Sequence, residues 1–205
     1  MRAMSLPEFS PLRTARLTLR PLREQDLADL LEVNGDPEVT RFLPYAPWRS
    51  LDDASAWLQR MHTIEAGGAA RQLVIEDTDG RVAGTVLLFR HDATHARLEV
   101  GYVLGRRHWH RGLMHEALAA LCAHAFGAMG VRRLEAEVRV GNDASMRLLE
   151  RLGFAREGLL RGRWVAQGEP YDTWMFGCLA QDRQRAGDDD APAADGSRVT
   201  AASPP

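Results

Sequence analysis

The sequence predicts a single α/β or α+β domain. Short β-like runs alternate with amphipathic helical patterns along the chain, and no internal repeat interrupts this alternation. A chain of 205 residues with 45% hydrophobic residues is long enough to bury one core. From residue 182 onward the composition shifts to Ala, Asp, Pro, Gly and Ser, which predicts a disordered tail over 182–205. The domain is therefore expected over 13–181, after an N-terminal arm over 1–12.

Seven runs predict strands and four predict helices. The strand runs are β-branched or alternating, and they cover 16–22, 72–76, 82–90, 97–104, 134–140, 154–165 and 171–179. The helical runs place apolar residues on one face, and they cover 24–33, 50–67, 112–126 and 143–152. Ser50 opens a sequence of capping-box form, and Asn142 is placed to cap the last helix.

Composition and charge exclude several classes of function. The net charge of −2 and the pI near 6.4 give no basic field of the kind that nonspecific nucleic-acid binding requires. No stretch approaches the roughly 20 apolar residues of a membrane helix, and Met1 to Pro11 lacks an apolar signal core. Cys122 and Cys178 are isolated, which argues against a disulfide framework or a thiolate metal site. We expect a cytoplasmic protein with no nucleic-acid or membrane partner.

A strand gives way to a helix at Gly112, within the run from Trp109 to Met114. A glycine there lets backbone N–H groups approach an anion, and the helix dipole adds partial positive charge. Diphosphate is the natural ligand of such a turn, although a plain turn is the commoner explanation of one glycine. The nearby His108, His110 and His115 lack the i, i+4 spacing of a zinc-binding helix, so no metal is expected.

Five segments occur in a characteristic order. They are 14–22 (TARLTLRPL), 36–39 (DPEV), 98–104 (LEVGYVL), 109–117 (WHRGLMHEA) and 142–154 (NDASMRLLERLGF). Together they resemble the GNAT superfamily of N-acetyltransferases, and specifically its RimJ/RimL-like branch, over roughly residues 13–180. The resemblance implies a mixed, mostly antiparallel sheet of about seven strands flanked by about four helices, in which a splayed strand pair forms the acetyl-CoA cleft.

The resemblance also implies how acetyl-CoA binds as co-substrate. The turn holds the diphosphate, and the strand over 99–104 pairs with the pantetheine arm, so that the N–H of Val103 or a neighbour faces the thioester carbonyl. The implied contacts are Tyr102, Val103, Leu104, Trp109, His110, Arg111, Gly112, Leu113, Met114, Asn142 and Ser145. One departure matters: the family's turn, Q/R-x-x-G-x-G/A, ends on a small residue where this chain has Met114. A side chain of this size crowds the diphosphate if it points inward.

Acetyl transfer needs a proton acceptor, because an alkyl amine with a pKa near 10 is mostly protonated at neutral pH. Glu99 is the candidate base, since Glu99, Gly101 and Val103 share one face of a strand. A solvated or salt-bridged surface carboxylate is the alternative explanation of Glu99. Ser145 is the candidate proton donor to the departing thiolate, against the alternative that Asn142 and Ser145 only cap a helix.

The acceptor is expected to be a primary amine, either a protein N-terminus or a small molecule, that attacks directly in a ternary complex. Phe42, Trp48 and Tyr171 are candidates for the acceptor pocket, although aromatic residues more often serve packing. The alternative function is a non-catalytic acyl-CoA sensor, and Met114 is the main argument for it. A Rossmann or P-loop module lacks its glycine motif here, and a homodimer is left open.

Overall fold

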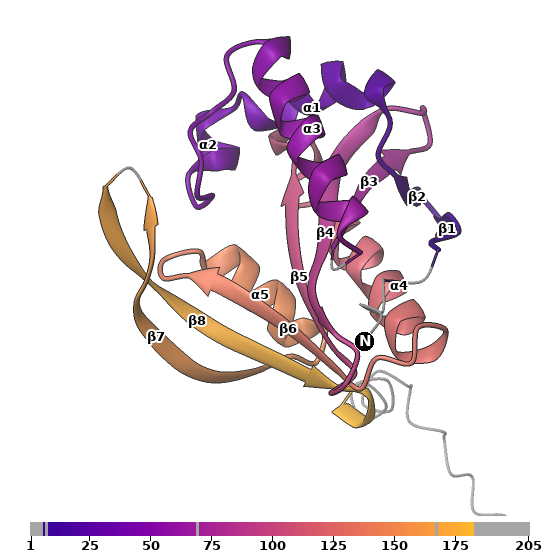
Figure 1. Cartoon of the computed structure of the whole chain (residues 1–205), viewed down its shortest axis with the longest axis vertical. Coiled ribbons are helices and arrows are strands. Elements are labelled where there is room, and N and C mark those ends of the chain that lie inside the picture. Colours follow the sequence, from indigo (N-terminus) through magenta and orange to yellow (C-terminus); the bar gives the residue numbers. More distant parts are fainter. Residues whose placement is uncertain (1–5, 7, 69, 167, 183–205) are drawn as a thin grey trace, which may run out of the picture.

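The computed structural model describes residues 6, 8–68, 70–166 and 168–182, so all of the predicted tail except Asp182 lies outside the described residues. Eight strands form one sheet in the order β1-β2-β3-β4-β5-β6-β8-β7 (Figure 1). Every neighbouring pair is antiparallel except β5 and β6, which are parallel. This confirms the mixed, mostly antiparallel sheet. In the described part of the chain, no helix is long and apolar enough to cross a membrane.

All of the predicted strands and helices are present. The strands are β1 (Leu12–Arg13), β2 (Leu17–Pro21), β3 (Arg71–Asp77), β4 (Val82–Asp92), β5 (Arg97–Leu104), β6 (Arg133–Arg139), β7 (Ala155–Ala166) and β8 (Glu169–Leu179). The α-helices are α1 (Leu27–Asn34), α2 (Pro37–Thr40), α3 (Leu51–Ala66), α4 (Leu113–Gly127) and α5 (Asp143–Arg151). Short 3₁₀ turns cover Glu24–Asp26 and Arg106–His108. The predicted capping box at Ser50 is also present.

Two short elements were not predicted. β1 has 2 residues, which is too few to show an alternating pattern. α2 has 4 residues and shows no apolar face, but it begins where Asp36 accepts a hydrogen bond from the N–H of Glu38 at 2.9 Å. Leu6 and Phe9 are buried in the main core, so part of the predicted N-terminal arm packs against the domain.

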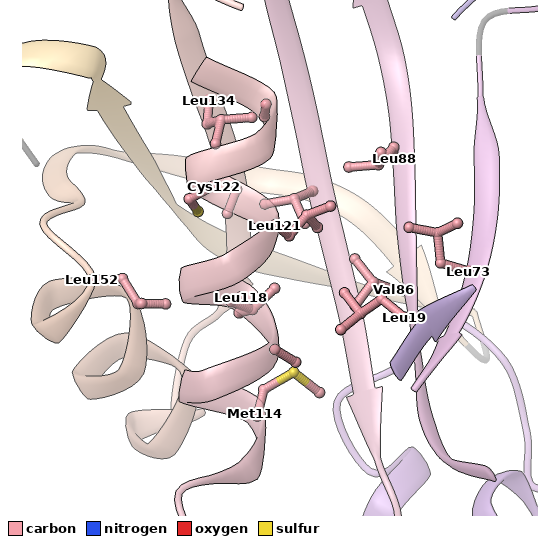
Figure 2. Packing of buried hydrophobic residues seen from close by; sticks show 14 of the residues in the cluster. Leu19, Leu73, Val86, Leu88, Met114, Leu118, Leu121, Cys122, Leu134 and Leu152 are labelled. Carbon is pink, nitrogen blue, oxygen red and sulfur yellow. The ribbon is translucent and has the colours of Figure 1, made fainter. Parts of the chain in front are cut away.

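Helices cover both faces of the sheet. On one face, α1 and α3 enclose a buried cluster that includes Val74 and Val82. On the other face, Leu118 and Leu121 of α4 share a cluster with Leu73 of β3, and Leu152, just after α5, belongs to the same cluster (Figure 2). The period of two in β3 sends alternate side chains into the two clusters. The core thus fixes α4 and α5 on the same side of β5.

The pairing between β5 and β6 ends early. Their register partners are Arg97 with Arg133, Leu98 with Leu134, and Glu99 with Glu135. Both strands then continue to Leu104 and Arg139, and Figure 1 shows β6 turning away from β5 together with β7 and β8. This confirms the splayed strand pair, and it leaves one edge of β5 without a strand beside it after Glu99.

The other edge of β5 lies unusually close to β4. A Cβ atom at Gly84 would overlap the backbone carbonyl oxygen of Val103, and the N–H of Gly105 donates to the carbonyl of Ala83 at 2.8 Å. Because both neighbours are backbone groups within a ladder, neither can move aside without breaking the pairing of the two strands. Gly84 is therefore required for the close approach of β4 and β5.

We predict that Gly84→Ala lowers the free energy of unfolding by about 2 kcal/mol, because the added methyl group meets backbone rather than a flexible side chain. Gly158→Ala is the matched control, since a Cβ at this β7 position meets nothing within 4 Å. The control should change stability by less than about 0.5 kcal/mol. Urea unfolding of both variants measures the difference, and equal stabilities would contradict the close approach.

Candidate active site

The backbone of β5 decides which N–H groups face the splayed pair. The carbonyl of Val103 and the N–H of Gly105 both face β4. Backbone groups of successive residues point to alternate edges, so Tyr102 and Leu104 direct theirs to the edge that β6 has left. Of the candidates for the donor, Val103 therefore faces β4, whereas its neighbours Tyr102 and Leu104 face the free edge. The carbonyl of Leu104 also accepts a hydrogen bond from Trp109 Nε1 at 2.7 Å, which fixes the turn to the strand.

The turn before α4 has the backbone geometry of an anion-binding loop. His110 and Gly112 have φ values of 58° and 72°, and α4 begins directly after them. The first N–H groups of a helix have no partners within the helix, so they are available to a ligand. Leu113 and Met114 are buried in the core, and Figure 2 shows Met114 pointing towards the sheet. The large residue at the end of the motif therefore leaves the N–H groups uncovered.

Arg16 lies beside this turn, although it is far from it in sequence. Its Nη1 donates to the carbonyl of Arg111 at 2.9 Å, and a Cβ at Gly112 would lie 3.6 Å from its Nη2. Glu116 holds Arg16 with an ion pair of 2.6 Å and also accepts from Thr14. The start of β2 is thereby bound to the first turn of α4. Arg16 adds a positive charge next to the turn that the local sequence pattern did not reveal.

Two arginines that precede the turn are already paired. Arg106 forms an ion pair of 2.8 Å with Asp36, and Arg107 forms one of 2.8 Å with Glu32. Arg107 also donates to Nε2 of the buried His108 at 2.9 Å. These contacts anchor the 3₁₀ turn to α1 and to the cap of α2. They leave Arg111 as the arginine of this segment directly beside the N–H groups.

Glu99 is a buried, ion-paired carboxylate. It is 4% exposed, and its Oε2 accepts a hydrogen bond of 2.7 Å from Arg90 Nη1. Burial has the largest effect on Glu99 and raises its pKa, although Arg90 acts in the opposite direction. Glu99 is thus salt-bridged, as the alternative explanation allowed, but it is not a solvated surface residue.

A second buried carboxylate, Glu137, shares Arg90 with Glu99. Arg90 Nη1 donates to Glu137 Oε1 at 3.1 Å, and Arg163, Trp164 and Thr173 also donate to Glu137. Burial opposes the ionisation of Glu137, but these hydrogen bonds outweigh it and lower its pKa. The pKa values of the two carboxylates are therefore shifted in opposite directions, an arrangement that suits one of them to proton transfer.

Glu137 was missed at the sequence level because its strand alternates apolar and charged residues, a pattern that indicates one solvated face. The alternation does place Glu135 and Glu137 on one face of β6, and Glu99 is in register with Glu135. The parallel pairing of β5 with β6 therefore places Glu135 and Glu137 on the same side of the sheet as Glu99. The alternation along β6 is visible in the sequence, but it indicates a role for Glu137 beside Glu99 only once the pairing of β5 with β6 is known.

Asn142 and Ser145 lie at the start of α5. Asn142 Oδ1 accepts from the N–H of Ser145 at 3.3 Å, so the predicted cap is confirmed. The hydroxyl of Tyr102 donates to the backbone carbonyl of Ser145 at 3.5 Å. Burial raises the pKa of Tyr102, so this hydroxyl is neutral at physiological pH. Tyr102 thus connects β5 to α5 beside the splayed pair.

Phe42 and Tyr171 both lie near the end of β6. A Cβ at Gly141 would lie 3.9 Å from Phe42 Cε1, and the Arg139 guanidinium lies 4.4 Å from the centre of the Tyr171 ring. Arg139 Nη1 also donates to the carbonyl of Arg41 at 3.5 Å. The segment after α2 is therefore held against the same end of β6 as Tyr171.

Trp48 has a different position from the other two aromatic residues. It is 8% exposed and packs against Trp57, with 5.3 Å between ring centres, inside the cluster beneath α1 and α3. Its backbone N–H donates to the carbonyl of Asn34. Trp48 is therefore a core residue, which is the commoner role of an aromatic side chain.

Within the described ranges, no three His, Cys, Asp or Glu side chains are grouped to hold a metal ion. Glu116, which lies beside the histidines of the turn, is engaged by Thr14 and Arg16. The arrangement instead combines N–H donors at a turn, a free strand edge and a buried carboxylate. These are the parts that a thioester, its diphosphate and an attacking amine would use.

Comparisons with known proteins agree with this geometry. The family model for an acetyltransferase (GNAT) domain matches residues 16–155. The N-acetyltransferase p20 of Bacillus licheniformis, itself uncharacterised, is 35% identical over 83% of this chain and 97% of its own length. The crystal structure of a GCN5-related N-acetyltransferase from Brucella melitensis has a TM-score of 0.79 at 26% identity, and the match covers 91% of this chain and 88% of that one.

A solved structure with bound ligands has the same fold. The spermidine N-acetyltransferase from Vibrio cholerae, in complex with CoA and spermine, has a TM-score of 0.72 at 22% identity, and the match covers 83% of this chain and 99% of that one. The family match spans more than half of the chain, and p20 is related along nearly its full length. The chain therefore belongs to the GNAT acetyltransferase family and is an acetyl-CoA-dependent acyltransferase.

Proposed function

We propose that this enzyme transfers the acetyl group of acetyl-CoA to a primary amine by direct attack in a ternary complex, with Glu99 as the base. The observation that carries the proposal is the position of a buried carboxylate on the strand whose free edge presents the N–H groups of Tyr102 and Leu104. The relatives named N-acetyltransferases support amine acetylation. The acceptor is a protein N-terminus or a small-molecule amine.

Acetyl-CoA is placed by backbone groups in this proposal. The N–H groups from His110 to Met114 bind the diphosphate, and Arg111 and the Glu116-paired Arg16 lie beside it. The free edge of β5 pairs with the pantetheine arm, as a further strand would. The N–H of Tyr102 or Leu104 then faces the thioester carbonyl, and Asn142 contacts the cofactor from α5.

The chemistry begins with the amine. Glu99 takes a proton from the acceptor ammonium, directly or through water, and the neutral nitrogen attacks the thioester carbon. A β5 N–H stabilises the oxyanion while the C–S bond breaks. The thiolate takes a proton from the Ser145 hydroxyl, which regains one from the nitrogen as the amide forms. The products are the acetamide, coenzyme A and one proton held by Glu99.

The RimJ/RimL-like branch and a cytoplasmic location remain part of the proposal. The segments at 14–22 and 142–154 support the branch, and the wide separation of Cys122 and Cys178 in the sequence, with no CxxC pair, supports the location. Phe42 and Tyr171 are the proposed acceptor contacts, because both lie at the end of β6. In a homodimer, the exposed Leu159, Trp164 and Val165 of the edge strand β7 would be available for the contact between subunits.

Thiol release distinguishes the enzyme from a silent acyl-CoA sensor. We expect purified protein to release free coenzyme A from acetyl-CoA when primary amines are added, and mass spectrometry should find an acetylated acceptor. A thiol reagent measures the release. Tight binding of acetyl-CoA without release, across a broad panel of amines, would support the sensor instead.

We predict that Glu99→Gln lowers kcat/KM about 100-fold near pH 7, where general bases typically contribute 10²–10⁴-fold. Because burial raises the pKa of Glu99, the wild-type rate should rise with pH as Glu99 loses its proton above the usual range of a glutamate. The variant should lose this limb and recover near pH 10, where the amine is neutral by itself. A pH–rate profile measures both effects.

Glu135→Gln is the control, since Glu135 is the register partner of Glu99 on β6 and pairs with Arg133 and Arg97. It should retain the limb and most of the rate, with the limb displaced to lower pH because the charge of Glu135 helps to raise the pKa of Glu99. If Glu99→Gln kept an unchanged pH–rate profile, Glu99 would not be the base.

We predict that Gly112→Val weakens acetyl-CoA binding at least tenfold, because a β-branched residue resists a φ of 72° and disturbs the N–H groups of the turn. Gly80→Val carries a similar backbone penalty, with a φ of 77° in the β3–β4 turn, and should bind normally. Calorimetric titration with acetyl-CoA measures both affinities. Equal affinities for the two variants would remove the turn from the binding site.

A further inference from the structure

The buried carboxylates beside the splayed pair already have cationic partners. Arg90 bridges Glu99 and Glu137, and Arg163 pairs with Glu137 at 3.0 Å. Arg90 is also held over the Trp164 ring, 5.1 Å from its centre, and its φ of 51° fixes it at an irregularity of β4. A polyamine would need unpaired carboxylates for its several positive charges. It would have to displace guanidinium groups that the fold holds in place.

Arg139 occupies the next position on the same face of β6. Residues 135, 137 and 139 alternate with the buried Leu134, Ala136 and Val138, so Arg139 follows Glu137 on the acceptor side. Its guanidinium stacks on Tyr171, and its polar contact is the Arg41 carbonyl at 3.5 Å. Among the residues that the structure describes, no carboxylate lies within ion-pair distance of Arg139.

Arg41 approaches the same place from the other side. It follows α2, its carbonyl contacts Arg139, and its guanidinium lies 5.3 Å from the centre of the Phe42 ring. In the described part of the chain, Arg41 likewise has no ion-pair partner. Two guanidinium groups, each placed over an aromatic ring and without an ion-pair partner among the described residues, thus lie near the end of β6.

We propose that the acceptor amine carries an anionic group and that Arg139, assisted by Arg41, binds it. This inference rests on the proposed function, since the amine must lie near Glu99. Glu135 is in register with Glu99, and four residues of strand separate it from Arg139, which is roughly 13 Å between Cα atoms. The Arg139 guanidinium lies over Tyr171, so the ligand is shortened only by its own contacts, and a hydrogen bond of about 3 Å at each end leaves roughly 7–10 Å, the length of two or three extended residues.

The ligand chemistry is therefore a carboxylate at that distance from a primary amine. Guanidinium binds carboxylate through two parallel hydrogen bonds, and stacking on Tyr171 presents the plane of Arg139 for this contact. Two sources supply such a group: a peptide N-terminus with aspartate at its second or third position, and a small amine with a terminal carboxylate, such as 6-aminohexanoate. Both share one anionic group and one reactive amine.

Matched acceptors test the proposal. The first pair is 6-aminohexanoate and 6-aminohexanamide, and the second is an amidated tetrapeptide with aspartate or asparagine at its third position. We expect the wild-type enzyme to prefer the anionic member of at least one pair by tenfold or more in kcat/KM, mainly through KM. Which pair shows the preference identifies the source of the carboxylate. Spermidine should be a poorer acceptor than the preferred anionic amine.

Arg139→Gln should remove the preference by raising KM for the anionic acceptor, while kcat for the neutral member and the affinity for acetyl-CoA stay unchanged. Arg132→Gln is the matched control, because Arg132 is an exposed arginine just before the opposite end of β6. It should keep the wild-type preference.

Equal kcat/KM within both pairs, a clear preference for spermidine, or an Arg139→Gln variant that weakens both members equally would each overturn the proposal. If the enzyme acetylated only neutral or cationic amines, the role of Arg139 would be overturned, but the proposed acetyl transfer would stand. No release of coenzyme A with any acceptor would contradict the proposed function instead. In that case, calorimetric titration of the two peptides in the presence of coenzyme A still tests the role of Arg139. Tighter binding of the aspartate peptide would support it, and equal affinities would overturn it.

Discussion

The early end of the β5–β6 pairing is the constraint on which the site depends. Parallel pairing stops at Glu99 and Glu135, while both strands continue. The contact between Gly84 and the Val103 carbonyl then determines that Tyr102 and Leu104 present their backbone groups at the free edge. The hydrogen bond from Trp109 to Leu104 brings the turn before α4 to that same strand. One interrupted ladder thus places the free edge of β5 beside the turn before α4, the two parts that we propose bind acetyl-CoA.

Ion pairing around the splayed strands organises the acceptor side. Arg90 connects Glu99 to Glu137, but burial raises the pKa of the first while hydrogen bonds lower that of the second. A buried carboxylate without a partner would cost several kcal/mol, so Arg90 makes the burial of Glu99 tolerable. The same pairing cancels the negative charge and leaves Arg139 and Arg41 as the unbalanced groups. In our proposals, the base and the acceptor-binding residues therefore belong to one charge network.

Local patterns allowed most of the fold to be predicted, and long-range contacts account for what was missed. Ser50 and Asn142 were recognised because capping depends on a few adjacent residues. Arg16 could not be recognised, because its approach to Gly112 joins segments about a hundred residues apart. Trp48 fitted a pocket wall by composition, but packing against Trp57 placed it in the core. The edge to which Val103 points depends on the register of β4, which strand propensity does not encode.

Backbone hydrogen exchange with and without acetyl-CoA tests the central claim most directly, since it reports on individual N–H groups of β5. The Val103 amide faces β4 and should be protected in both states. The amides of Tyr102 and Leu104 face the free edge, so at least one of them should exchange quickly in the free enzyme and become protected when acetyl-CoA binds. Unchanged exchange at both amides, with new protection confined to other segments, would contradict binding of the cofactor along the free edge of β5.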